Sequence, residues 1–291
     1  MRIIHDLDEM TETARGWLTG GSVGLVPTMG HLHAGHVALV QASLNECEFS
    51  VVSIFDTSLQ LESDESLALI PRDLARDLQL LDEQQVDVVF IPDPEDFYPA
   101  NFSTQIVPSG PIAERLEGAA KPGYMCKVGT AMMKLFQLVR PDVVFLGQKK
   151  IQLVALIRKL VSDLNIDLSV RVLPTVRESD GLAVSSRTGL LSPAERQAAS
   201  ILYQALLAGK AIIEKSERRS ATIEKVMADV IANEPLVKLD YAAICDPNTF
   251  ETVEETLGTD LSDLLLVIAV HVGSTRLIDN ILWKSSGYWL T

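Results

Sequence analysis

The chain has 291 residues, of which 47% are hydrophobic and 22% are charged, and its formal net charge is −14. This composition is ordinary for a folded globular protein and excludes wholesale disorder, and the length predicts one large or two modest domains. The acidic balance repels a phosphate backbone, so we expect no nucleic-acid partner, although a local basic pocket can still hold a small anionic substrate.

Short apolar runs alternate with amphipathic stretches through the first part of the chain. Strands are predicted at Ser22–Pro27, Phe49–Phe55, Val86–Ile91, Val143–Leu146 and Leu168–Leu173. Helices are predicted at Gly35–Asn45, Pro71–Gln85, Thr130–Val139 and Lys149–Leu164. Repeated strand–helix–strand units form a parallel sheet with helices on both faces, and ligands bind beyond the carboxyl ends of its strands. Motifs that follow a strand therefore matter most.

The pattern changes after the last of these strands. A polar loop, TVRESDGLAVSSRTG, leads to Ser192-Pro193, which is typical of a helix start, and alanine-rich helical stretches continue to about Asn233. Lys238–Cys245 and Leu264–Val272 are then predicted strands. We therefore expect an α/β domain over residues 1–175 and a smaller α+β domain over residues 176–291.

The cysteines and the first residues of the sequence indicate the cellular compartment of the protein. Cys47, Cys126 and Cys245 lie far apart and form no CxxC pair, so neither a disulfide framework nor a cysteine zinc site is indicated. The start, MRIIHDLDEM, has acids and no apolar signal segment, and the apolar run Leu264–Val272 is too short to cross a bilayer. We expect a cytoplasmic protein without a membrane partner.

Three of the five histidines fall within HLHAGH, between His31 and His36. They follow PTMG, at the end of a predicted strand and the start of a helix. His33 and His36 are three residues apart, so both imidazoles can project from the first turn toward one point, and Gly35 leaves room for a ligand. A helix N-terminus favours phosphate, and two imidazole donors can stabilise charge on an α-phosphate.

Three other interpretations of these histidines stay open. They can be surface residues of a loop, ligands of a zinc ion, or polar side chains packed at a strand end. Zinc needs a third or fourth ligand, and the flanking sequence has no nearby Cys, Asp or Glu. The position at a strand end favours phosphate binding over these three.

Two more polar segments fit a phosphate site. Gly147-Gln148-Lys149-Lys150 directly follows a predicted strand, where a lysine can pair with phosphate oxygens. Ser185-Ser186-Arg187 places two hydroxyls and a guanidinium in one polar loop, which suits a triphosphate. Taken singly, each segment also fits a solvated helix start or an ordinary serine-rich loop.

Together, PTMGHLHAGH, GQKK and PTVRESDGLAVSSR resemble the signature blocks of the pantoate–β-alanine ligase (pantothenate synthetase) family, within the HxGH nucleotidylyltransferase superfamily. The resemblance continues in SIFDTSLQ, PRDLARDLQLL, KLFQLVRPDVVFLG and TRLIDN, so it spans almost the whole chain. It implies a Rossmann-like N-terminal domain that holds the active site, a smaller C-terminal lid domain, and a homodimer.

The reaction implied by the resemblance has two steps. ATP and a hydroxy acid, with Mg²⁺, give an acyl-adenylate and pyrophosphate, and an amine then attacks to give an amide and AMP. Pantoate and β-alanine are the default acid and amine. AMP is a far better leaving group than oxide, and a closed site protects the mixed anhydride from water.

The resemblance also implies roles for residues of this chain. The implied catalytic residues are His33, His36, Lys149 and Arg187. The implied ATP-binding residues are Met29, Gly30, His33, His36, Gly147, Lys149, Val176, Ser185, Ser186 and Arg187. The implied acid-binding positions are Thr57, Gln60, Gln152 and Leu153. Asp77 is implied as a ligand of Mg²⁺.

Several positions depart from the family pattern. The usual SIFVNPxQF reads SIFDTSLQL, so Thr57 stands in place of the family's Asn, and the usual PGHFRG reads PGYMCK. The usual GEKDxQQ reads GQKKIQL, so Lys150 replaces the acid that holds the ATP ribose and Leu153 replaces a glutamine that hydrogen-bonds pantoate. Loss of a polar partner weakens discrimination for a substrate hydroxyl, so the pattern fits retained adenylation with an altered acid.

Three functions therefore stay open. The first is a carboxylate–amine ligase of this family, either with the default substrates or as a specialised paralogue with another acid or amine. The second is a nucleotide-binding protein without ligase activity, because Lys150 replaces the ribose-binding acid. The third is a nucleotidylyltransferase that makes a dinucleotide, and the long C-terminal region with TRLIDN argues against it.

Overall fold

Two sheets organise the part of the chain that the structure describes, which comprises residues 1–18, 20–55, 73–253, 257 and 262–291. In this computed structural model, the larger sheet has six parallel strands in the order β1-β4-β3-β2-β5-β6. The strands are β1 (Arg2–Ile4), β2 (Val23–Thr28), β3 (Phe49–Ile54), β4 (Val88–Phe90), β5 (Val143–Gly147) and β6 (Ser169–Leu173). The central strand β2 delivers the histidine loop at its carboxyl end.

The strands of the larger sheet bury side chains on both faces. Leu25 and Val51 belong to a core shared with α1, α8 and α9, whereas Val26 and Val52 pack with α2 and α4 on the opposite face. These helices are α1 (Leu7–Trp17), α2 (Ala34–Glu46), α4 (Leu74–Glu83), α8 (Tyr124–Val139) and α9 (Ile151–Asp163). Successive side chains of a strand point to opposite faces, so a strand covered on both sides is mainly apolar.

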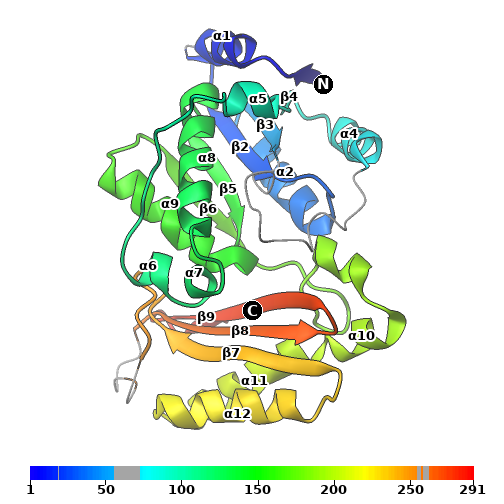
Figure 1. Ribbon diagram of the computed structural model, residues 1–291, viewed down its shortest axis with the longest axis vertical. Coiled ribbons are helices and arrows are strands. Elements are labelled where there is room, and N and C mark those ends of the chain that lie inside the picture. Colours follow the sequence, from blue (N-terminus) through cyan, green and yellow to red (C-terminus); the bar gives the residue numbers. More distant parts are fainter. Residues whose placement is uncertain (19, 56–72, 254–256, 258–261) are drawn as a thin grey trace.

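The second sheet is antiparallel, in the order β10-β9-β8-β7. Its strands are β7 (Val237–Cys245), β8 (Leu264–Val272), β9 (Thr275–Lys284) and β10 (Tyr288–Leu290). The helices before it are α10 (Pro193–Ala198), α11 (Ile201–Glu214) and α12 (Ser220–Ala232). Helices α11 and α12 cover the face that points away from the larger sheet (Figure 1), whereas Leu265 and Val267 on the other face join the core of the larger sheet.

Short helices complete the described part of the chain. They are α5 (Pro94–Phe97), α6 (Pro111–Glu114), α7 (Glu117–Ala120), and the 3₁₀ turns η2 (Gln148–Lys150) and η3 (Ser186–Leu190). Both 3₁₀ turns contain residues that the sequence predicts to belong to the site, and residues of both turns line a cavity. No helix among the described residues is both long enough and apolar enough to cross a bilayer.

The predicted α/β class, with a parallel sheet and a second α+β unit, is confirmed, and so are the predicted strands and most helices. Ser192 caps α10, and Glu195 bonds back to it in a capping box. Helix α8 begins at Tyr124 instead of Thr130, after Gly123 turns the chain with a φ of 79°. Strand β9 and helix α1 were not predicted. The first residues of the predicted Pro71–Gln85 helix lie outside the described residues, and the division at residue 175 stays a prediction.

Candidate active site

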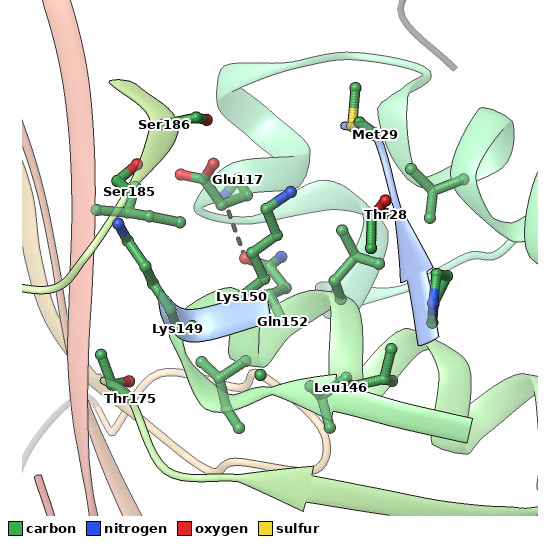
Figure 2. A pocket seen from close by; sticks show the side chains of 18 of the residues that line it. Thr28, Met29, Glu117, Leu146, Lys149, Lys150, Gln152, Thr175, Ser185 and Ser186 are labelled. Carbon is green, nitrogen blue, oxygen red and sulfur yellow. Dashed lines mark hydrogen bonds between the residues drawn. The ribbon is translucent and has the colours of Figure 1, made fainter. Parts of the chain in front are cut away.

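A cavity of about 320 Å³ lies at the carboxyl ends of β2 and β5, where a parallel sheet is expected to bind ligands. Predicted site residues from three separate segments meet on its wall: Met29, Gly30, His33, His36, Gly147, Lys149, Gln152, Leu153, Val176, Ser185, Ser186 and Arg187. Figure 2 shows Lys149 and Lys150 reaching into this space from one side, opposite Thr28 and Met29. Thr57 and Gln60 lie outside the described residues.

His33 and His36 form an unusual cap at the start of α2. The backbone N–H of Gly35 donates to His33 Nδ1 over 3.1 Å, and the backbone N–H of His33 donates to His36 Nδ1 over 3.3 Å. The ring centroids are 4.0 Å apart with 35° between the planes. A Cβ on Gly35 would approach His33 Cε1 to 2.9 Å, so a larger residue at this position would require the ring to shift. Because both Nδ1 atoms accept, each neutral ring carries its proton on Nε2.

Both imidazoles are neutral at physiological pH. Burial, and then the charges of Lys149 and Lys150, lower the pKa of His33 to about 4. Burial, followed by the charges of His33 and the same two lysines, holds the pKa of His36 well below its usual value. The pair therefore offers two uncharged N–H donors at a helix N-terminus, beside lysine charges that attract an anion.

The structure separates the alternatives for the histidines. Both rings line the cavity and are half-buried, so they are not loop residues exposed to solvent. A zinc site finds no support, because the described residues contain no group of three His, Cys, Asp or Glu side chains placed to hold a metal. One nitrogen of each ring is satisfied by the backbone, and the other can bind a ligand.

Lys149 connects the larger sheet to the serine loop. Its Nζ donates to the carbonyl of Val184 over 3.1 Å and to that of Ala183 over 3.4 Å. Burial, against the opposing charge of Asp279 and with the charges of Lys150 and Arg187, lowers the pKa of Lys149 to about 7. An anionic ligand in the cavity would stabilise the ammonium form, so the charge of this side chain depends on occupancy.

The serine loop is held from behind by a buried ion pair. Arg177 donates to the Asp279 carboxylate over 2.7 and 3.0 Å and to the carbonyl of Gly181 over 3.0 Å, and Asp279 is only 2% exposed. The hydroxyl of Ser185 accepts from the Arg187 N–H over 3.3 Å and starts η3. Strand β9 thus fixes the direction in which the serine loop faces the cavity.

Asn280 joins β9 to the lysine turn. Its Nδ2 donates to the carbonyls of Gln148 and Lys149, each over 3.1 Å, and Gln148 Nε2 donates to the carbonyl of Leu290 over 3.2 Å. Both amide side chains are buried. The TRLIDN segment noted in the sequence therefore sets the position of Lys149, a role that the sequence did not reveal.

The side chain of Gln152 hydrogen-bonds to three backbone groups of the protein. Its Nε2 donates to the carbonyls of Ile112 and Arg115 over 2.8 and 2.9 Å, and its Oε1 accepts from the Glu117 N–H over 3.1 Å (dashed in Figure 2). The next residue, Leu153, lines the cavity with an apolar side chain. The predicted acid-binding role of both residues stays a prediction, and the bonds of Gln152 show that it positions α6 and α7.

Three residues on the cavity wall escaped the sequence analysis. Arg276 donates to the Glu117 carboxylate over 2.6 and 3.0 Å, and the hydroxyl of Tyr241 donates to the same carboxylate over 3.0 Å. These contacts join residues more than a hundred positions apart, which local spacing cannot reveal. The only signal was the occurrence of Arg276 within TRLIDN.

Asp77 lies behind the histidine loop. Its carboxylate accepts from the backbone N–H groups of His31 and Leu32 over 2.7 and 2.8 Å, and the side chain is buried. The cavity wall includes both Gly30 and His31 but not Asp77. The predicted magnesium ligand is thus bonded to the loop that carries the histidines.

Comparisons with known proteins find similarity over almost the whole chain. The family model described as pantoate-beta-alanine ligase matches residues 2–282. Pantothenate synthetase of Dehalococcoides mccartyi is 44% identical over 89% of this chain and 95% of its own, and that of Heliobacterium modesticaldum is 43% identical over 96% and 98%.

Solved structures give the same result. Pantothenate synthetase from Thermus thermophilus superposes with a TM-score of 0.88 at 37% identity, covering 96% of this chain and 98% of its own. Pantoate-beta-alanine ligase from Francisella tularensis, complexed with beta-gamma ATP and beta-alanine, gives a TM-score of 0.78 at 28% identity over 99% of both chains.

Proposed function

The chain belongs to the pantoate–β-alanine ligase family, and from this premise we propose that the described cavity joins pantoate to β-alanine with cleavage of ATP to AMP and pyrophosphate. The enzyme is a ligase that forms an amide bond. The observation that carries the proposal is the pair of neutral imidazoles on the same cavity wall as Lys149 and the serine loop.

In the first step, a carboxylate oxygen of the acid attacks the α-phosphorus of ATP, and the bond to pyrophosphate breaks. Negative charge grows on the α-phosphate oxygens and on the leaving group. The Nε2–H groups of His33 and His36 are placed to donate to the α-phosphate, and Lys149 to pair with the leaving pyrophosphate. Ser185, Ser186 and Arg187 hold the β- and γ-phosphates.

In the second step, the amine attacks the acyl carbon, the bond to AMP breaks, and the amide forms. The ammonium group of β-alanine must lose a proton before it can attack. Strand β9 and the serine loop line one part of the cavity wall, which would limit access of water to the mixed anhydride from that side. Met29, Gly30, Gly147 and Val176 are proposed to contact the nucleotide from the strand ends.

The described residues do not fit a magnesium site built by the protein. They contain no group of three ligating side chains, and both oxygens of Asp77 accept backbone N–H groups. Mg²⁺ prefers hard oxygen ligands, and the triphosphate of ATP itself supplies them. We therefore propose that Mg²⁺ enters with the nucleotide.

Two further proposals follow from family membership. We propose that the protein is a homodimer, which light scattering coupled to size-exclusion chromatography would test. We also propose a cytoplasmic location, supported by the use of ATP and by three free thiols, those of Cys47, Cys126 and Cys245.

A second candidate is the same chemistry with an acid other than pantoate. It is favoured by one observation: Leu153 lines the cavity with an apolar side chain, while the amide of neighbouring Gln152 is bonded to backbone. A site without a polar partner for a hydroxyl discriminates weakly in favour of a hydroxy acid.

Pyrophosphate exchange into ATP, measured across a panel of acids, tests both candidates. Exchange that depends on pantoate supports the default function, and exchange with another acid alone supports the second. Under the second candidate, Leu153→Gln raises exchange with pantoate about tenfold, whereas the control Leu153→Met does not. The absence of exchange with every acid contradicts both.

A further inference from the structure

Asp77 is a buried carboxylate with a fixed pair of backbone partners. It lies in the first turn of α4 and is 3% exposed. One oxygen accepts from the His31 N–H over 2.7 Å and the other from the Leu32 N–H over 2.8 Å. A carboxylate that accepts two N–H groups orients the peptide units that carry them.

The loop that Asp77 holds has a backbone that needs such support. Gly30 has a φ of 82° and His31 a φ of 52°, so two consecutive residues adopt left-handed conformations. The second of them carries a side chain, for which this conformation is unfavourable. The turn directs successive N–H groups toward one point, which forms an anion-binding nest, and the Asp77 carboxylate fills it.

The residues that carry the two catalytic imidazoles follow this loop in the chain. His33 follows Leu32 directly and adopts the extended conformation of a helix cap, with a φ of −141°. Its own N–H donates to His36 Nδ1, so the peptide after Leu32 also orients the second ring. A change at Asp77 would therefore reach both imidazoles through two residues of backbone.

From this chain of contacts we infer that Asp77 is a positioning residue for the histidine pair and does not ligate magnesium. The inference rests on the proposed function, because it concerns the orientation of the two donors to the α-phosphate. Asp77 acts through the peptide bonds of His31 and Leu32 and does not touch the substrate.

The surroundings of Asp77 also argue against a divalent ion there. Both of its oxygens hold backbone N–H groups, and the Arg76 guanidinium lies 3.9 Å from one of them. The described part of the chain offers no group of three His, Cys, Asp or Glu side chains that could complete a coordination shell. A positive neighbour and occupied acceptors favour N–H donors over a cation.

Asp77→Asn tests the inference, because asparagine keeps the shape but turns an NH₂ group toward one of the two backbone N–H groups. We expect pyrophosphate exchange at saturating ATP to fall about tenfold or more, since small misplacement of catalytic donors is costly. The concentration of Mg²⁺ that gives half-maximal exchange should stay unchanged. Asp82→Asn, on the same helix but at an exposed position, is the matched control and should retain full exchange.

A metal-ligand role predicts different results. Restoration of exchange in Asp77→Asn by excess Mg²⁺ or Mn²⁺, or a severalfold rise in the half-maximal Mg²⁺ concentration, would overturn the inference. Full activity of the variant would overturn it as well. Because catalysis can fail for other reasons, the imidazole nitrogens of the protein without ligands provide a second readout by NMR.

In the unsubstituted protein, His33 and His36 should both show the Nε2–H tautomer, and in Asp77→Asn one or both should lose it. Unchanged imidazole signals in a folded variant would contradict positioning even if the protein had no ligase activity. If Asp77→Asn does not fold, Mn²⁺ added to the unsubstituted protein without nucleotide decides: selective broadening of the His31 and Leu32 amide signals would indicate a metal on Asp77, and unbroadened signals support positioning.

Discussion

The two histidines present uncharged N–H groups to the cavity because the backbone occupies one nitrogen of each ring. Their Nδ1 atoms accept N–H groups at the start of α2, which leaves the proton on Nε2. Burial keeps the pKa of His33 at about 4, so the ring stays neutral across the physiological range. A preorganised neutral donor costs no reorganisation when charge develops on a phosphate.

His36→Ala is expected to slow pyrophosphate exchange by about 10²–10³-fold, because one preorganised donor to a transition-state charge is removed. The fold should be retained, since the substitution deletes one hydrogen bond of the cap at the start of α2. His5→Ala is the control: His5 is exposed, and its ring nitrogen hydrogen-bonds to the carbonyl of Ile91. An exchange rate in His36→Ala equal to that of the control would refute the catalytic role.

Lys149 should take up a proton when ATP binds. Its pKa of about 7 in the empty cavity means that at about pH 8.5 the amine is mostly neutral, and the polyanion then favours the ammonium form. Below about pH 6 the amine is already charged, so the uptake should vanish.

Calorimetric titration of ATP in buffers with different ionisation enthalpies measures this uptake. The relevant quantity is the difference between the unsubstituted protein and Lys149→Met, which cancels protons released by ATP itself. We expect nearly one proton at the higher pH. Equal uptake in both proteins would show that the ammonium of Lys149 does not respond to the nucleotide.

At the scale of elements, Gln152 on α9 clamps α6 and α7 against the cavity. Three hydrogen bonds to backbone atoms of Ile112, Arg115 and Glu117 fix these short helices, which have no long apolar face of their own. Glu117 can then meet Arg276 from β9. The clamp therefore contributes to the cavity wall.

Gln152→Leu keeps the side-chain volume but removes the donor to the buried carbonyl of Ile112 and the acceptor of the Glu117 N–H, and each group left unsatisfied costs about 1–3 kcal/mol. We expect a clear fall in the free energy of unfolding in urea. Gln79→Leu, at an exposed position of α4, should leave it unchanged. Unchanged stability together with a raised KM for the acid would instead indicate that Gln152 contacts the substrate.

The sequence predicted best those strands that are buried on both faces of the sheet. Strands β2, β3 and β5 are mainly apolar because helices cover both faces, and the pattern is visible in FSVVSIF. Strand β9 was missed because Asp279 and Asn280 interrupt its apolar run. Those residues are polar because they bond to Arg177 and to the lysine turn, contacts that exist only after folding.

The candidate site was predictable to the extent that its residues follow strands. The histidine, lysine and serine segments each follow a strand or lie in the loop after one, and all three meet at one cavity. Glu117 and Tyr241 carry no such signal, because their contact joins distant parts of the chain. Asp77 was predicted to be a magnesium ligand, and local sequence could not show that both of its oxygens accept backbone N–H groups.

At the scale of the whole molecule, polar contacts tie the smaller sheet to the larger one. Arg276 of β9 pairs with Glu117 and Asp240, and the side chains of Arg276 and Glu117 are only 14% and 13% exposed. Asn280 adds bonds to the lysine turn. Leu265 and Val267 add apolar contact, so the two sheets share part of one core.

Arg276→Ala should destabilise the protein by about 3 kcal/mol or more, because it leaves the buried Glu117 carboxylate without its cationic partner. If residues 1–175 and 176–291 are separate domains, heating this variant should reveal two transitions in scanning calorimetry. Arg219→Ala removes an exposed local pair with Glu217 and serves as the control. An Arg276→Ala melting curve identical to that of the control would show that the pair does not couple the sheets.

The central claim is that this cavity activates a carboxylate by transfer to AMP, and the fate of a carboxylate oxygen tests it most directly. Pantoate labelled with ¹⁸O in its carboxyl group is incubated with the protein, ATP, Mg²⁺ and β-alanine, and the masses of the products are measured by mass spectrometry. The account predicts that AMP carries one ¹⁸O atom, because the attacking oxygen leaves with the phosphate when the amide forms. Unlabelled AMP, or label found in inorganic phosphate, would contradict it.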